Sequence, residues 1–97
     1  MVDIVKIKSG GYQIQLNSES GSCLLKSEAF GSKTEAKGML ENVISNPVFE
    51  RKTNHQGEFM VTLKTSSGKA LGHSNTYSSE AGMENGIKNL MKTLKSL

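Results

Sequence analysis

The residues of this chain that could act as nucleophiles, proton acceptors or metal ligands are few and far apart. Beyond the hydroxyls and carboxylates they are two histidines, His55 and His73, and one cysteine, Cys23. A catalytic site needs a nucleophile or an acid–base pair beside a group that orients it, and a zinc site needs closely spaced ligands. The sequence contains neither pattern. It therefore predicts a protein with no enzymatic activity, no cofactor and no metal site.

Each of these three residues has an ordinary structural explanation. His55 falls in a predicted turn, where a solvated histidine is common, and His73 falls in a predicted strand, either as a surface residue or as a general base. A single cysteine cannot form an internal disulfide, and Cys23 is best explained as a small buried apolar side chain. The sequence shows no secretory signal and no apolar run of about 18 residues. We therefore expect a reduced, cytoplasmic setting without membrane contact.

Residues 24–33 return in altered form at residues 71–80, and the repeat extends along the chain. At an offset of 47 residues, without a gap, eight pairs of residues are identical. They are Gly10/Gly57, Leu16/Leu63, Ser20/Ser67, Gly21/Gly68, Leu24/Leu71, Ser27/Ser74, Ser32/Ser79 and Asn42/Asn89. Such a repeat predicts one supersecondary unit used twice, here over residues 2–47 and 48–97 of a single domain, 1–97.

Each repeat begins with three segments that have the pattern of strands. Residues 12–17 and 59–63 alternate apolar and polar side chains, which is the period of a half-buried strand. Glycine-containing turns separate the segments, so neighbours along the chain should pair antiparallel. The expected strands are residues 2–8, 12–17, 23–27, 48–54, 59–63 and 69–74.

A helix follows the strands in each repeat. Ser32 and Glu35 fit a capping box, and Ser79 stands at the equivalent place before the second helix. Asn46 is expected to adopt a left-handed conformation that ends the first helix before Pro47. Apolar residues then recur at helical spacing: Ala36, Met39, Leu40, Val43 and Ile44 in the first helix, and Met83, Ile87, Leu90, Met91 and Leu94 in the second.

Neither unit can bury both its sheet face and its helix stripe alone. The predicted fold class is therefore α+β, with two tandem β-β-β-α repeats forming one antiparallel sheet and two helices packed on one face. An internal two-fold axis should relate the repeats.

Polar residues recur where the third strand of each repeat leads into its helix. Ser27 and Ser74 favour hydrogen bonds to the following backbone over a nucleophilic role, while Phe30 and Tyr77 favour packing in the core. The helix N-termini could attract an anion, although ordinary capping explains their serines. The candidate surface of the repeat motif comprises Ser27, Glu28, Ser32, Lys33, Ser74, Asn75 and Ser79.

These residues carry a resemblance to the YegP-like family, small bacterial proteins of unknown function built from one or two copies of such a unit. The resemblance covers nearly the whole chain. It lies in the Tyr12-x-Ile14-x-Leu16 strand, Gly21, residues 24–33 and the Asn85-Gly86-Ile87 step. It implies three strands and a helix per unit, then a strand that crosses to the partner unit, with both units sharing one sheet.

Two positions bear on that expectation. The family's helix glycine, which would allow close approach of helix and sheet, is present as Gly86 but is replaced by Met39 in the first repeat. Residues 48–54 can serve both as the crossing strand and as the opening strand of the second unit, and nothing after Leu97 supplies an equivalent strand. We therefore expect one open sheet edge, which invites pairing with another chain.

Two functions remain open. The first is a non-catalytic interaction module that uses a sheet face or edge to bind a protein partner or a second copy of itself. The net charge of +3 arises entirely in residues 48–97, an excess that is mild for a nucleic-acid-binding domain. The second is therefore a weak, sequence-independent nucleic-acid binder using Arg51, Lys52, Lys64, Lys69, Lys88, Lys92 and Lys95.

Overall fold

The computed structural model describes residues 2–96 and consists of two successive β-β-β-α units. Met1 and Leu97, the two ends of the predicted domain, lie outside the described residues. The first unit contains β1 (Val2–Lys6), β2 (Tyr12–Asn17), β3 (Cys23–Ser27) and α1 (Lys33–Ser45). The second contains β4 (Val48–Thr53), β5 (Phe59–Lys64), β6 (Ala70–Ser74) and α2 (Glu80–Lys95). The predicted order and type of these elements are confirmed.

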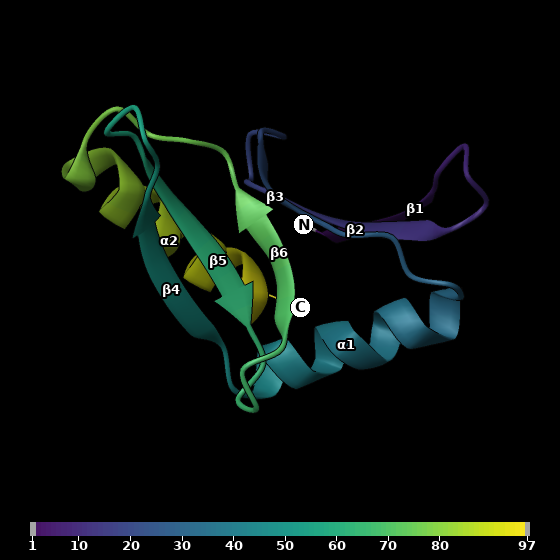
Figure 1. Ribbon diagram of the computed structural model, residues 1–97. Coiled ribbons are helices and arrows are strands. Elements are labelled where there is room, and N and C mark those ends of the chain that lie inside the picture. Colours follow the sequence, from purple (N-terminus) through teal and green to yellow (C-terminus); the bar gives the residue numbers. More distant parts are fainter. Residues whose placement is uncertain (1, 97) are drawn as a thin grey trace.

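The strands form one six-stranded sheet in the order β1-β2-β3-β6-β5-β4. The two units meet where β3 pairs antiparallel with β6. On either side of this central pair the two halves of the sheet turn away from each other (Figure 1). The sheet is antiparallel throughout, as predicted.

The expectation of a crossing strand at residues 48–54 is wrong. β4 pairs with β5 and forms one edge of the sheet, while β1 forms the other. The two are symmetry mates, so both edges are open rather than one. The physical reason is the tight turn after β4, in which the Asn54 N–H donates to the Glu58 carbonyl at 3.0 Å and Gly57 takes a positive φ of 75°. This local hairpin holds β4 against β5.

The central strand pair approaches too closely for a side chain at Gly72. Gly72 lies opposite Ser27, and a Cβ added to it would meet the carbonyl oxygen of Lys26 and would lie 2.7 Å from the Cα of Ser27. Its counterpart in the first repeat is Leu25, which is buried in the core. The internal symmetry is therefore inexact beside the two-fold axis, where β3 carries Leu25 and β6 carries Gly72.

A bulge interrupts each outer hairpin at equivalent places. The register between β2 and β3 shifts between Leu16 and Asn17, and that between β5 and β6 shifts between Leu63 and Lys64. The extra residue is Leu24 in β3 and Leu71 in β6, and both are buried. Each bulge thus turns an additional leucine into the core, which explains why this pair is identical in the two repeats.

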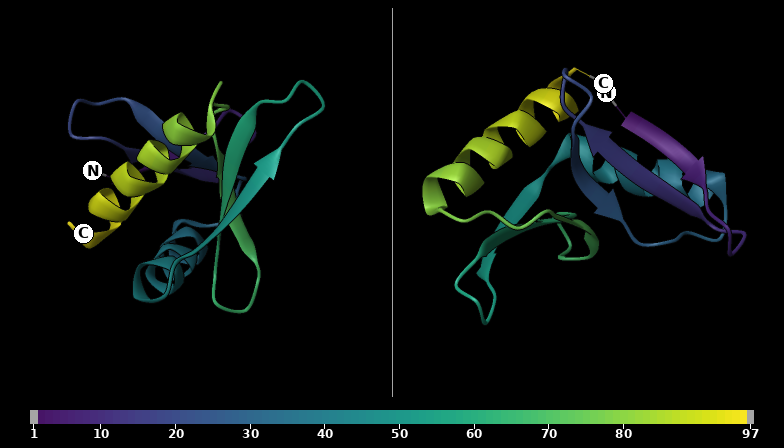
Figure 2. Two further views of the ribbon diagram at one scale, coloured as in Figure 1. Left: turned by 90° about the vertical axis from the view of Figure 1, so that its left-hand side faces the viewer. Right: turned by 90° about the horizontal axis from the view of Figure 1, so that it is seen from above.

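Both helices pack on the same face of the sheet. Each is capped by the predicted serine: the Ser32 hydroxyl accepts the Glu35 N–H at 3.1 Å, and the Ser79 hydroxyl accepts the Gly82 N–H at 3.0 Å. Each helix contacts strands of both units, and Figure 2 shows them lying across the sheet. None of the helices in residues 2–96 is long and apolar enough to cross a lipid bilayer.

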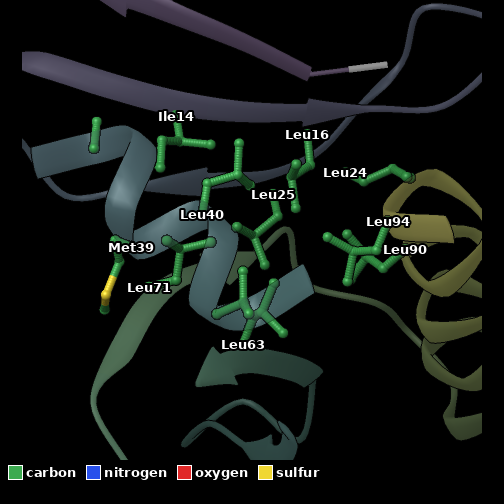
Figure 3. Packing of buried hydrophobic residues seen from close by; sticks show 12 residues of the cluster. Ile14, Leu16, Leu24, Leu25, Met39, Leu40, Leu63, Leu71, Leu90 and Leu94 are labelled. Atoms are coloured by element: carbon green, nitrogen blue, oxygen red, sulfur yellow. The ribbon is translucent and has the colours of Figure 1, made fainter. Parts of the chain in front are cut away.

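The helices and the strands share one main core cluster (Figure 3). Its leucines come from four strands and two helices, with both units represented, so neither unit buries its apolar face without the other. The buried members are Ile14, Leu16, Leu24, Leu25, Ala36, Met39, Leu40, Val43, Leu63, Leu71, Leu90 and Leu94. A smaller cluster between β5 and α2 consists of Val61, Met83 and Ile87.

Two local expectations are wrong. Asn46 ends α1 at φ −155° and ψ 71°, which is not a left-handed conformation, because its N–H bonds the Asn42 carbonyl at 3.2 Å and the chain turns directly into β4. Gly86 does not serve close approach of a strand. A Cβ there would collide with the ring of Tyr77, so the glycine makes room for an aromatic ring to lie over α2.

One ion pair ties α2 to the edge strand β4. The Arg51 guanidinium donates from Nε to Glu84 Oε2 at 2.5 Å and from Nη2 to Oε1 at 3.0 Å. The hydrogen bond to Arg51 holds the pKa of the Glu84 carboxyl below its ordinary value. Because both side chains are about half exposed, solvent weakens the pair.

Replacing Gly72 with alanine should destabilise the fold severely, because a methyl group there meets backbone and not a movable side chain. We expect a loss of several kcal/mol in the free energy of unfolding, at the level of strongly disruptive core changes of about 4 kcal/mol. Gly38→Ala is the matched control, since Gly38 lies in α1 with open space around it and alanine favours helix. Urea unfolding of both variants measures the difference. Equal stability of G72A and wild type would contradict the close approach.

The contribution of the Arg51–Glu84 pair should depend on pH. A carboxyl whose folded-state pKa is lowered stabilises the fold above its unfolded-state pKa, near 4.3, and loses that effect as pH falls through the lower folded value. Glu84→Gln should therefore lower the melting temperature more at pH 7 than near pH 3. Glu41→Gln, on the exposed side of α1, controls for the loss of one charge. An unchanged gap between E84Q and wild type at both pH values would refute this account.

Candidate functional site

The recurring serines Ser27 and Ser74 are buried structural residues. The Ser27 hydroxyl accepts the Ile14 N–H at 2.8 Å and donates to the Glu28 carbonyl at 2.7 Å. The Ser74 hydroxyl accepts the Val61 N–H at 2.9 Å and donates to the carbonyl of the next residue at 2.8 Å. This confirms the prediction that they bond nearby backbone. Both face the core side of the sheet, so they do not contribute to a solvent-exposed surface.

These hydroxyls replace a backbone hydrogen bond where the third strand parts from the second. Just beyond each serine the chain bulges outward and then rejoins its neighbour through an isolated bridge, Tyr12 with Phe30 and Phe59 with Tyr77. In the first bridge the Phe30 N–H donates to the Tyr12 carbonyl at 2.7 Å. The recurring Ser-x-x-aromatic pattern therefore allows the chain to separate from the hairpin after β3 and after β6 and to continue into the following helix.

The remaining residues of the predicted motif surface do not gather into one site. Ser32 and Ser79 cap different helices, and Glu28 and Lys33 are exposed. Asn75 links the units, because its side-chain amide donates to the Cys23 carbonyl at 3.0 Å. These residues connect the strands to the helices. Among the described residues their side chains do not point toward one common site.

The two histidines and the cysteine also lie apart. His55 is exposed in the turn between β4 and β5, and His73 is exposed on β6, where its Nδ1 bonds the hydroxyl of the fully buried Thr62 at 2.8 Å. Cys23 is partly buried. Within residues 2–96 no group of three or more histidine, cysteine or acidic side chains is placed to hold a metal ion.

The basic residues of the second repeat are spread over several surfaces. Arg51 reaches toward α2 at one sheet edge, and Lys69 lies in the turn between β5 and β6. Lys52 and Lys64 both bond Glu50, at 3.0 and 2.6 Å. The last three lie along α2, namely Lys88, Lys92 and Lys95. The fold therefore does not bring the seven cations together.

The sheet face opposite the helices carries a continuous row of six side chains, one from each strand. Consecutive members stand opposite each other in neighbouring strands, where Cβ atoms lie about 4.5–5.5 Å apart. We call these residues the open-face row. In spatial order they are Asp3, Gln15, Lys26, His73, Thr62 and Glu50.

The open-face row obeys the internal two-fold. Its first three members precede their counterparts Glu50, Thr62 and His73 by 47 residues. Acids therefore stand at both ends and the two basic side chains meet in the middle, at the junction of the units. Sequence reasoning missed this row, because none of its pairs is identical and the pairing of β3 with β6 is needed to assemble it. The signal available was the like-for-like pair of acids at positions 3 and 50.

Removing a bridging serine should cost stability without disturbing the surface. Ser27→Ala leaves the buried Ile14 N–H without its acceptor, and an unsatisfied buried donor costs about 1–3 kcal/mol. Ser74→Ala should have the same effect through Val61. Ser66→Ala, in an exposed turn, provides the control and should lie within about 0.5 kcal/mol of wild type. Denaturant unfolding compares them, and a neutral S27A would count against the bridging role.

The chain is similar to proteins that carry the YegP name. It is 34% identical over 94 residues to the UPF0339 protein YegP of Yersinia pestis, covering 93% of this chain and 84% of that one. It is 32% identical over 91 residues to a UPF0339 protein of Pseudomonas aeruginosa, covering 90% and 83%. A family model described as a domain of unknown function, DUF1508, matches residues 54–95.

Solved structures agree with the fold described above. The solution structure of YegP from Escherichia coli, a protein of unknown function, aligns with a TM-score of 0.87 at 26% identity over 96% of this chain and 84% of that one. The solution structure of a UPF0339 protein from Shewanella oneidensis aligns with a TM-score of 0.89 at 26% identity, covering 97% and 83%. With these matches in sequence and in fold, the chain belongs to the UPF0339 family of YegP-like proteins, which are uncharacterised.

Proposed function

We propose that this protein is a non-catalytic binding module that holds an acidic segment of a partner protein on the open face of its sheet. The observation that carries the proposal is the open-face row, which crosses all six strands and places Lys26 beside His73 at its centre. The helices cover only the other face, so Lys26 and His73 are exposed on this one, whereas Thr62 of the row is fully buried.

The charges of this face favour an acidic partner. Among residues 2–96 the Lys26 ammonium has no ion-pair partner, and its neighbour His73 is exposed. The acids at the ends are already engaged: Asp3 accepts the side-chain amide of Asn17 at 3.1 Å, and Glu50 binds two lysines. The centre therefore offers the unneutralised positive charge of Lys26, while at the ends the Glu50 charge is balanced by two lysines and the Asp3 carboxylate keeps its charge.

The face is also partly preorganised. The buried Thr62 hydroxyl holds the His73 ring through a hydrogen bond of 2.8 Å, and the Gln15 amide donates to the Gln13 side chain at 3.2 Å. Side chains that are already held lose less conformational freedom when a partner binds. The held polar side chains around the unpaired Lys26 ammonium thus favour the binding of a partner over catalysis.

The edge strand β4 is less suited to binding. β4 carries Glu50, Arg51 and Lys52 in succession, and all three are ion-paired. Charged side chains on an edge strand discourage the addition of another strand. We therefore place the partner on the face and not on the edge that the sequence also allowed.

A nucleic-acid partner is the second candidate and has weaker support. Four of the seven basic residues of the second repeat are paired with acids, namely Arg51, Lys52, Lys64 and Lys92. Backbone binding to nucleic acid releases counterions in proportion to the phosphates neutralised and so weakens steeply with salt. Within residues 2–96 the other three, Lys69, Lys88 and Lys95, form no ion pair, and they come from the β5–β6 turn and from α2.

The test places the photo-crosslinking residue p-benzoylphenylalanine at position 15 in the native cells. We expect protein adducts from Gln15, resistant to nuclease, that are absent when the same residue replaces Glu41 on α1. The double variant Lys26→Glu with His73→Glu should abolish them, whereas Lys37→Glu should not. Mass spectrometry should locate the crosslink in an acidic segment of the partner.

Three outcomes would overturn the proposal. Adducts that survive the double charge reversal would remove the role of Lys26 and His73. An adduct of twice the chain mass would replace the acidic partner with a second copy of this protein. Adducts to nucleic acid that disappear at moderate salt would favour the second candidate.

A further inference from the structure

Two polar pockets lie where the turn of one repeat meets the helix of the other. Pocket A, with a volume of about 410 Å³, lies between the β2–β3 turn and α2. Pocket B, of about 280 Å³, lies between the β5–β6 turn and α1. Figure 2 shows the β2–β3 turn beside the C-terminal part of α2. The first volume is at the lower end of the range for ligand sites, which begins at about 300 Å³, and the second is just below it, which suits a small molecule.

The two pockets correspond under the internal two-fold. Ser18, Ser20 and Asn89 line pocket A, and the residues that match them at the 47-residue offset line pocket B, namely Thr65, Ser67 and Asn42. Two of these three pairs are identical in the repeats. These three polar positions are thus repeated in both pockets, each of which needs both units, whereas the charged residues of the two pockets do not correspond at this offset.

The turn hydroxyls are held in the same way in both copies. Ser18 and Ser20 share a hydrogen bond of 2.8 Å between their hydroxyls, and Thr65 and Ser67 share one of 2.9 Å. A backbone N–H also donates to the first hydroxyl of each pair, at 3.2 Å in pocket A and 3.1 Å in pocket B. Each pocket therefore presents two fixed oxygens.

Among residues 2–96 neither the Asn42 nor the Asn89 side chain forms a hydrogen bond, and Asn42 is exposed. Asparagine is a poor helix former, and its place within a helix, twice at equivalent positions, lowers helix stability. A carboxamide that faces two hydroxyls across a pocket offers a donor and an acceptor to a ligand.

Each pocket also contains one carboxylate and one ammonium. The turn supplies the acid and the helix the base in pocket A, and the reverse holds in pocket B. In pocket A the turn supplies Glu19 and the helix supplies Lys92. In pocket B the helix supplies Glu35 and the turn supplies Lys69. The Glu19–Lys92 pair is 3.5 Å apart with side chains 84% and 70% exposed, so a ligand that carries both charges can replace it at little cost.

We propose that the twin pockets bind a small zwitterion of the free amino-acid type. Its carboxylate bonds the lysine, its ammonium bonds the glutamate, and the asparagine and turn hydroxyls bond the remaining polar atoms. Opposite charges in each pocket exclude simple anions and simple cations, since each would meet one like charge. The pockets share no residue with the open-face row, so this site is independent of the proposed protein partner.

The test is a titration of the ¹⁵N-labelled protein with glycine, followed by amide and side-chain NMR shifts. We expect saturable shifts at Asn42, Asn89 and both turns. We expect no such shifts with acetate, which carries only the carboxylate, with methylammonium, which carries only the ammonium, or with glucose, which carries only hydroxyls. Asn89→Ala should weaken binding at pocket A about tenfold, the loss of roughly 1.4 kcal/mol, and leave pocket B unchanged. Asn42→Ala should do the reverse.

Each copy of the site controls for the other, because both variants alter a helix surface position away from the core cluster. Absence of saturable shifts in either pocket would overturn the proposal. So would shifts that persist in N42A and N89A, or equal responses to glycine and glucose. Loss of the open-face adducts described above would not affect this result, so the two proposals fail separately.

Discussion

The pairing of β3 with β6 is the interaction on which the rest of this structure depends. Among the strands of residues 2–96 it is the one pair that joins the two repeats, and it brings together residues 45 or more positions apart. Gly72 permits the approach, because any side chain there would meet the backbone of β3. Without it each unit would keep an exposed apolar face and no common core.

Several features follow from that junction. The bridging serines release β3 and β6 from their hairpins, so the strands can leave toward the helices while the Ile14 and Val61 N–H groups keep an acceptor. The bulges turn Leu24 and Leu71 into the shared core. Each helix then contacts strands of both units. Duplication therefore produced a single structure whose halves cannot bury their apolar surface separately, and not two independent units side by side.

The same junction separates the two surfaces available for binding. On the helix-free face it aligns six side chains into the open-face row, with Lys26 and His73 at the axis. At the far ends of the hairpins it brings each turn against the helix of the other repeat, which forms the paired pockets. One surface lies on the two-fold and occurs once, whereas the other lies off the axis and occurs twice. This distinction suits a single macromolecular partner in the first case and a small ligand in the second.

The sequence by itself determined the local elements. The alternation in residues 12–17, the caps at Ser32 and Ser79, and the repeat itself specified strands, helices and their order, because each depends on neighbours only a few positions away. The order of the strands in the sheet became known only from the tertiary structure. Distant strands pair through backbone hydrogen bonds, and these depend little on which side chains the strands carry. For that reason the place of β4 at an edge, the close contact at Gly72, the open-face row and the paired pockets could not be derived beforehand. Each depends on which distant segments meet.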